Sequence, residues 1–455
     1  MSRNASVLAV GVLAAGVLLL PAAPASAGQF HGVDVVDDFD CDGVSDAVYP
    51  DPFYDVGSAG NAGSVAVYYS GAGVGQIRYT QNTPGVPGTA ETGDVFGEAH
   101  ASTDVNGDGC DELIVGSPGE DDFGGMVTII EGSPNGLVPT RSTAYTQNTP
   151  GVPGTSEDGD WFGTTIVAGT ITSGQAYLVV GSPGERLADG SDSGAVYYFR
   201  GGVWRTVNMD TPGVVGAPEG GNLGETIAAG DRYIAVGAPN DQVGDRYSAG
   251  SVHVFSHRIV GGVPDPIASI SQDTAGVSGS PETGDHFGAD VSVISYLPSA
   301  GAQVGALVAV GVPDEKLGSD TEAGMAHLIA VTPTGKVTEL SDVNQDTSGV
   351  PDSTERGDQF GYSIALAAGA SGTTATPTTT LLAVGVPGET ASDGSTGALH
   401  VFRNPTAPGT GDVWRPNSNT SSHSYWHIGA TSTELLSLDW YGSISERVPW
   451  SALIP

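Results

Sequence analysis

The sequence predicts an all-β fold, a β-propeller of six to seven four-stranded blades. Three observations support this prediction. Gly and Pro account for 69 and 29 of the 455 residues, which indicates many turns and few helices. Three short phrases return in the same order along the chain. Between them lie short β-branched runs without helical periodicity, and radial repetition of such strands is typical of a propeller.

The first phrase is Gly-Asp-x-Phe-Gly, and its regular return means a repeat array. Its clear copies begin at Gly93, Gly159, Gly284 and Gly357. Weaker copies are Gly221-Asn222-Leu223-Gly224 and Asp439-Trp440-Tyr441-Gly442, and Phe30 lies one similar step before the first clear copy.

The other phrases mark the strands of each unit. The second phrase ends an apolar run with Gly-x-Pro, and Pro stops the strand because it cannot donate to the ladder. Its Pro residues are Pro118, Pro183, Pro239, Pro313 and Pro387. The third phrase opens a further strand with Gly63, Gly125, Gly194, Gly250, Gly324 or Gly397. A fourth, less regular strand precedes a turn-rich linker such as Gln81 to Val86, which gives four antiparallel strands per unit.

These phrases set the expected domain limits. We expect blades at approximately 28–82, 93–148, 159–210, 221–273, 284–346 and 357–404, with 405–455 as a closing segment or an incomplete blade. The last residues either start an unfinished seventh blade or pair with the N-terminal segment to close a ring.

The N-terminus has the pattern of a secretory signal peptide over residues 1–27. A basic start at Arg3 precedes an apolar run from Val7 to Leu20 and a small-residue tail that ends at Ala27. No second apolar run long enough to span a bilayer follows. We therefore expect a secreted, extracellular chain without membrane insertion.

The charge balance limits the partners. The 52 acidic and 15 basic residues give a formal net charge of −37. Such a surface favours solubility and argues against nucleic acid and anionic lipid as partners. Cations are its natural counterparts, and we expect a monomer.

Two segments carry regularly spaced oxygen ligands, at Asp38–Asp46 and Asp104–Glu112. Each has a carboxylate or amide at positions 1, 3 and 5, Gly at position 6 and an acid at position 9. Ca²⁺ prefers six to eight hard oxygens, which alternate side chains in a tight turn supply. The predicted ligands are Asp38, Asp40, Asp42, Val44, Asp46, Asp104, Asn106, Asp108, Cys110 and Glu112, with Val44 and Cys110 acting through their carbonyls.

These loops have two other interpretations. An EF-hand requires Glu at position 12, where this chain has Tyr49 and Val115, so the EF-hand is excluded. The alternative without a metal is an Asp-rich turn that is only solvated.

The Phe-Gly opening and the Gly-Ala-Pro-like close, literal at Gly237-Ala238-Pro239, resemble the FG-GAP repeat family over nearly the whole mature length, in a secreted form of bacterial type. In that family each repeat is one propeller blade, as in the N-terminal head of integrin α chains. The resemblance implies calcium loops between the first and second strands of a blade and work of an adhesion or recognition kind. The unit at Asn222-Leu223-Gly224 departs from the family pattern at the aromatic position.

Cys41 and Cys110 are the only cysteines. An oxidising compartment permits a disulfide between them, and two separate thiols are the alternative.

Several polar residues recur at one position per unit. Acids follow the Pro of the second phrase at Glu120, Glu185, Asp241, Glu315 and Glu389, and we expect them to bond loop amides or the neighbouring blade. His253, His327 and His400 share a repeat position that other units fill with Ala, Thr or Tyr, so we interpret them as scaffold. His423 and His427, near Trp426, form either a ligand patch or an irregular closing segment.

No catalytic residue is predicted, because the sequence lacks the common nucleophile, zinc and phosphate motifs. The sequence therefore favours a calcium-binding recognition module for an extracellular protein or glycan. The alternatives are an extracellular polysaccharide hydrolase or lyase on a propeller scaffold, and a structural scaffold without a ligand.

Overall fold

The protein is described by a computed structural model that covers residues 37–70, 75–216, 220–369, 374–390, 396–416, 427–430, 434–438 and 444–449. The expected signal peptide, Phe30, His423, Trp426 and the phrase at Asp439 to Gly442 lie outside these residues. Among the residues that the structure describes, no helix has the length and hydropathy needed to cross a bilayer.

The strands form seven antiparallel sheets, each a meander of neighbours in sequence. Sheet one contains β1 (Ala47–Asp51), β2 (Ser64–Tyr68) and β3 (Gln76–Tyr79). Sheet two contains β4 (His100–Thr103), β5 (Glu112–Ser117), β6 (Met126–Glu131) and β7 (Val138–Tyr145). Sheet three contains β8 (Ile166–Thr170), β9 (Ala176–Ser182), β10 (Ala195–Arg200) and β11 (Val203–Asn208). Sheet four contains β12 (Thr226–Ala229), β13 (Tyr233–Ala238), β14 (Ser251–Val260) and β15 (Val263–Ile270).

The remaining sheets continue the same order. Sheet five contains β16 (Asp290–Tyr296), β17 (Gly305–Val312), β18 (Met325–Val331) and β19 (Val337–Val343). Sheet six contains β20 (Ser363–Ala368), β21 (Thr380–Thr390), β22 (Thr396–Phe402) and β23 (Val413–Pro416). Sheet seven contains β24 (His427–Ala430), β25 (Glu434–Leu438) and β26 (Ile444–Pro449).

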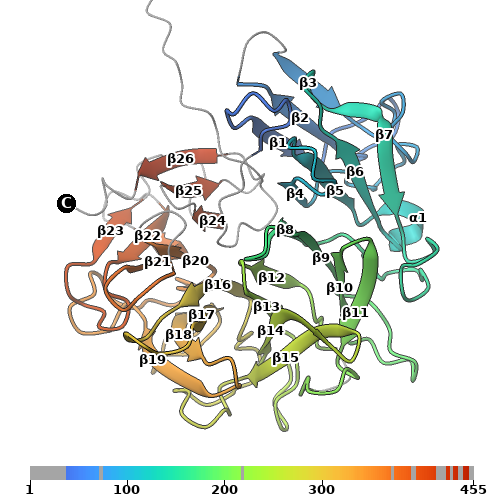
Figure 1. Ribbon diagram of the computed structural model, residues 1–455. Helices are drawn as coiled ribbons and strands as arrows, with labels where there is room; N and C mark the ends of the chain where they lie inside the picture. Colours follow the sequence, from blue (N-terminus) through green and yellow to red (C-terminus); the bar gives the residue numbers. More distant parts are fainter. Residues whose placement is uncertain are drawn as a thin grey trace, which may run out of the picture.

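The sheets are set side by side around a common centre, with the first strand of each four-stranded sheet innermost (Figure 1). The inner strands β4, β8, β12, β16, β20 and β24 contact one another in that order. This arrangement is that of a β-propeller, in which each sheet is a blade, and it confirms the predicted fold class.

The apolar core lies between neighbouring sheets. Phe162, the aromatic of one Phe-Gly phrase, is fully buried and packs with Val127 of sheet two and Tyr197 of sheet three. Its ring meets that of Tyr197 edge to face at 5.0 Å between centroids. Phe96, Phe287 and Phe360 are equally buried. The repeated aromatic therefore fills the space between two blades.

Local signals explain most strand limits. The third phrase opens β2, β6, β10, β14, β18 and β22, and the Gly-x-Pro stop ends β5, β9, β13 and β17 as expected. The prediction is wrong for β21, which continues past Pro387 to Thr390. The pairing register with β22 shifts between Val386 and Thr390. At such a bulge a residue is left out of the ladder, so the strand can continue although Pro387 has no N–H to donate.

The ends of the array differ from its middle. Sheets one and seven have three described strands each, and β23 lies beyond residue 404, in the segment expected to close the array. One short turn, α1 (Glu120–Phe123), has left-handed backbone angles at Asp121 and Asp122, so it is no regular helix.

Candidate metal centre

The first acidic loop, Asp38–Asp46, leads into β1 and is held by its own side chains. The Asp38 carboxylate accepts the N–H groups of Asp42 at 3.0 Å and of Gly43 at 2.9 Å. The Asp42 carboxylate in turn accepts the N–H of Val44 at 2.8 Å. Gly43 has a φ of 82°, which the turn requires and which Gly adopts without strain. Carboxylate oxygens of Asp38, Asp40 and Asp42 consequently lie within 4.8 Å of one another.

The second loop, Asp104–Glu112, joins β4 to β5 and has the same geometry. Asp104 accepts the N–H groups of Asp108 at 3.1 Å and of Gly109 at 2.9 Å. Asp108 accepts the N–H of Cys110 at 3.0 Å. These bonds join the same positions, 5 to 1, 6 to 1 and 7 to 5, as in the first loop. The two loops are therefore built alike although their sequences differ.

The acid at position 9 turns toward the backbone of each loop. Asp46 accepts the N–H groups of Phe39 at 3.1 Å and of Ser70 at 2.9 Å. Glu112 accepts the N–H of Val105 at 2.6 Å and the side-chain amide of Asn106 at 2.7 Å. Burial raises the pKa of each acid to about 7. The structure thus brings together the acids of positions 1, 3 and 5 in the first loop and engages the acid of position 9 in holding the turn.

Position 7 differs between the loops. Val44 is exposed, whereas Cys110 is buried. In both cases the N–H of this residue is used by the acid at position 5, as described above.

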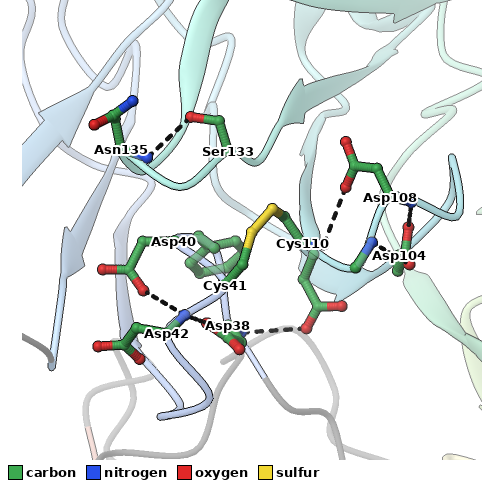
Figure 2. Close-up of a disulfide and its surroundings, with 12 residues drawn as sticks. Asp38, Asp40, Cys41, Asp42, Asp104, Asp108, Cys110, Ser133 and Asn135 are labelled. Atoms are coloured by element: carbon green, nitrogen blue, oxygen red, sulfur yellow. Dashed lines mark hydrogen bonds between the residues drawn. A yellow bond between two sulfur atoms is a disulfide. The ribbon is translucent and has the colours of Figure 1, made fainter.

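A disulfide joins the two loops (Figure 2). It connects Cys41, at position 4 of the first loop, with Cys110, at position 7 of the second, with their Cα atoms 4.8 Å apart. Beside it, the Asp38 N–H donates to the Asp111 carboxylate at 3.2 Å and the Asp111 N–H donates to the Asp38 carbonyl at 3.0 Å. The structure therefore shows the bonded form of the two cysteines and places the loops in contact.

The donor set of these loops fits a hard divalent cation. The carboxylates of positions 1, 3 and 5 lie close together in loop one, and burial and the charge of Asp42 raise the pKa of Asp40. Oxygen atoms at this spacing are the ligands that Ca²⁺ prefers. The residues at position 12, Tyr49 and Val115, lie in β1 and β5, as expected for a loop followed by a strand.

A second acidic group lies between sheets four and five and has a different setting. Carboxylate oxygens of Glu282, Asp285 and Glu315 lie within 4.8 Å of one another. The buried Gln272 side chain donates to Glu315 at 2.7 Å, which links the end of sheet four to sheet five. Burial raises the pKa of Glu315 to about 7.

This Gln to Glu bond recurs between other blades. The further pairs are Gln81 with Glu120, Gln147 with Glu185, and Gln345 with Glu389. Where Met209 replaces the Gln, the shorter Asp241 accepts a hydrogen bond from Ser251 at 2.7 Å instead. The repeated acid after the Pro therefore bonds the neighbouring blade, which is the structural role expected for it.

The three repeat-equivalent histidines are buried. His253 bonds Ser251 at 3.0 Å and Ser269 at 2.9 Å, and His327 bonds Glu339 at 2.6 Å. Burial lowers the pKa of His253 to about 4 and that of His400 to about 3. Their position between sheets is that of scaffold residues.

Sequence reasoning missed one polar group, which is centred on His286 and Asp314. Their Nδ1 and Oδ2 atoms lie 2.6 Å apart. The signal was available, because Asp314 follows a Pro at a place where three other units have Gly119, Gly184 or Gly388. The sequence alone, however, does not show that the partner of Asp314 is His286, because the two residues lie 28 positions apart.

The comparisons with known proteins agree with the repeat. The profile of the FG-GAP repeat matches residues 96–130, from the aromatic of one phrase through the second acidic loop to β6. This match confirms the predicted resemblance. No curated protein matches the sequence.

Among solved structures, a luciferin-regenerating enzyme matches with 10% sequence identity over 74% of this chain and 82% of that chain, at a TM-score of 0.31. A likeness this low supports no conclusion about fold or function.

Proposed function

We propose that this chain is a secreted, calcium-binding propeller that acts as a recognition module for an extracellular protein or glycan. The observation that carries the proposal is the pair of acidic loops that share one pattern of Asp to backbone hydrogen bonds and are joined by a disulfide. A disulfide of this kind persists in oxidising compartments, which supports an extracellular location.

Calcium would act on the scaffold. Three carboxylates within 4.8 Å repel one another unless a cation lies among them. The proposed ligands of loop one are the side chains of Asp38, Asp40 and Asp42, and those of loop two are Asp104, Asn106 and Asp108. Binding only to the folded loops would stabilise the folded state by mass action.

Calorimetric titration of the metal-free full chain with calcium chloride tests the metal proposal. We expect two sites per chain and a melting temperature that rises with calcium. Asp42→Asn removes one ligand charge from loop one and Asp108→Asn does the same for loop two, and each variant should weaken one site by at least about tenfold.

The matched control is Asp189→Asn, which alters an exposed loop Asp whose carboxylate accepts the N–H of Ser191. This control should keep both sites. An absence of binding heat, together with a melting temperature that calcium does not change, would contradict the metal proposal.

The recognition proposal needs a separate experiment. The full chain is screened against extracellular proteins and a glycan array, with calcium and with a chelator. Capture of a partner in the presence of calcium supports recognition, whereas a screen without any partner favours a structural scaffold.

A further inference from the structure

A chain of polar side chains crosses three neighbouring units of the otherwise repetitive fold. We call it the polar network, and its members are Asn222, Glu225, Asn240, His286, Asp314 and Gln359. The Asn240 amide donates to Asn222 and to Glu225, both at 3.3 Å. His286 meets Asp314 at 2.6 Å, and the Gln359 amide donates to Asp314 at 3.4 Å. The network thus has two hydrogen-bonded parts, one around Asn240 and one around Asp314, and the charge of His286 acts on Glu225 across the gap between them.

The network exists because two units depart from the repeat. Gly119, Gly184 and Gly388 follow the Pro in other units, and a Cβ atom there would lie 1.8 Å from the carbonyl oxygen of a neighbouring Gly. The fourth and fifth units place Asn240 and Asp314 at this position instead. Their partners Asn222 and His286 occupy the third position of the first phrase, where Val95, Trp161 and Gln359 have the same left-handed φ of 51° to 56°, so the departure lies at Asn240 and Asp314. Positions that break the rules of their own scaffold are expected at functional sites.

The network lies on the face of the propeller opposite the two acidic loops, whose proposed calcium sites make them the metal loops. Its members immediately precede the inner strands β12, β16 and β20 or follow the ends of β13 and β17. In antiparallel pairs such as β12 with β13, the start of one strand and the end of the next meet at the same edge. The acidic loop Asp104–Glu112 joins β4 to β5 at the other edge. The proposed calcium ligands of the two acidic loops therefore lie on the other face from the network.

His286 is oriented and accessible. Asp314 fixes its Nδ1, and the side chain is 34% exposed. Among the described residues no further hydrogen bond reaches its Nε2. When a carboxylate holds one nitrogen of an imidazole ring, the ring is oriented and its other nitrogen can bond a ligand. The hydrogen bond that His286 donates to the Asp314 carboxylate also raises the pKa of His286, so its Nε2 more often carries a proton to donate.

We propose that the polar network is a saccharide-binding site on the face opposite the metal loops. Amides that donate and accept, carboxylates that accept and an oriented imidazole match sugar hydroxyls, which both donate and accept. Trp161 has the position of Asn222 in the preceding unit and is 42% exposed, so it adds an exposed aromatic ring on the same face. The inference rests on the recognition function proposed above but not on calcium.

The test is a glycan array followed by calorimetry with the best oligosaccharide, using the full chain with calcium present. His286→Gln introduces the residue that the next unit has at this position, and Asp314→Gly restores the residue of three other units, so both variants suit the scaffold. Each should weaken binding about tenfold or more, because a polar contact to the ligand is lost. Val95→Gln changes the same repeat position outside the network and serves as the matched control.

Melting temperatures of all variants show whether the fold is kept. Loss of binding in the two network variants, with Val95→Gln unchanged, supports the site. Equal glycan binding in all four proteins overturns the site but leaves the recognition function standing. Capture of a protein without any glycan overturns the saccharide class alone, and hydrolysis of the array glycans replaces the binding module with an enzyme. A screen without any partner overturns both proposals.

Discussion

At the scale of single residues, the glycine of the third phrase is required by the neighbouring blade. Gly250 has a φ of 85°, and a Cβ atom there would lie 2.2 Å from the carbonyl oxygen of Phe287. Gly63, Gly125 and Gly324 have the same setting against Phe96, Phe162 and Phe360. The phrase recurs because the backbone of each blade approaches the Phe-Gly phrase of the next without room for a side chain.

Alanine at Gly250 should therefore destabilise the fold strongly. Gly250→Ala combines the strain of a left-handed backbone with a clash against main-chain atoms that cannot move away, and we expect a loss of about 3 kcal/mol or more. Gly261→Ala is the matched control, because Gly261 also has a positive φ, 62°, but a Cβ atom there would meet nothing within 4 Å. It should cost about 1 kcal/mol. Denaturant unfolding measures both, and equal losses would show that packing against Phe287 does not matter.

At the scale of elements, the two acidic loops are one structural unit. The disulfide and the paired bonds between Asp38 and Asp111 connect loop one, which precedes β1, with loop two, which joins β4 and β5. Phe39 within loop one also contributes its carbonyl to the N–H of Ser133 at 3.1 Å. Sheets one and two are thus held together at the acidic loops as well as in their apolar core.

Removal of the disulfide should loosen this junction. The bond joins residues 69 positions apart, and closing a loop of that length contributes about 4 kcal/mol in the chain-entropy model. We expect a double Cys41→Ser and Cys110→Ser variant to lose stability of this order in denaturant unfolding. Reduction of the wild-type protein with dithiothreitol is the control and should give the same loss. An unchanged midpoint in both would falsify a stabilising role of the bond.

The calcium affinity of the two loops should also depend on the disulfide between them. The disulfide holds loop one against loop two, where Asp38 and Asp111 exchange hydrogen bonds. Without the disulfide loop one is less ordered, so its proposed ligands lose more conformational entropy when they bind calcium. We expect the double variant to bind calcium about tenfold more weakly at one site or both, measured by calorimetry. Affinities equal to those of the wild type would show that each loop is preorganised alone.

Local sequence signals were sufficient for some features and insufficient for others. Many strand limits follow from Pro positions because Pro acts on its own backbone, as Pro118 does at the end of β5. The acidic loops follow from spacing for the same reason. The bond between Gln272 and Glu315 crosses 43 positions, and the dyad of His286 and Asp314 crosses 28. Such partners meet only through the packing of one unit on the next, which no local pattern describes.

At the scale of the whole molecule, acidic groups are buried at regular intervals around the ring. The four Gln to Glu bonds join successive blades, and burial raises the pKa of Glu120, Glu185, Glu315 and Glu389 to about 7. Nearby carboxylates such as Asp285 add to the rise at Glu315. With a net charge of −37 on the chain, each proton taken up by these sites relieves repulsion inside the blades.

Stability should therefore fall as the pH rises from 6.5 to 8.5. The folded state binds more protons than the unfolded state between the ordinary Glu value of about 4.5 and the raised value of about 7, so raising the pH through 7 removes stability. Buried histidines such as His253, whose pKa falls to about 4, act in the opposite sense, but only below about 6.5, where the unfolded chain takes up protons. His286, whose pKa the hydrogen bond to Asp314 raises, loses its proton in the window above 6.5 and adds to the fall in the same direction.

One substitution tests this account at a single pair. Glu315→Gln keeps an acceptor for the Gln272 amide but removes the titration, so we expect the variant to gain on the order of 1 kcal/mol over the wild type at pH 8.5 and little at pH 6.5. Asp245→Asn alters a carboxylate that is 91% exposed and should leave the pH dependence unchanged. Both comparisons use thermal unfolding with calcium present, so that the proposed metal ligands stay bound in the folded state. If the wild type and Glu315→Gln keep parallel profiles across this window, the inter-blade Glu is ionised at neutral pH, and the blades tolerate its charge.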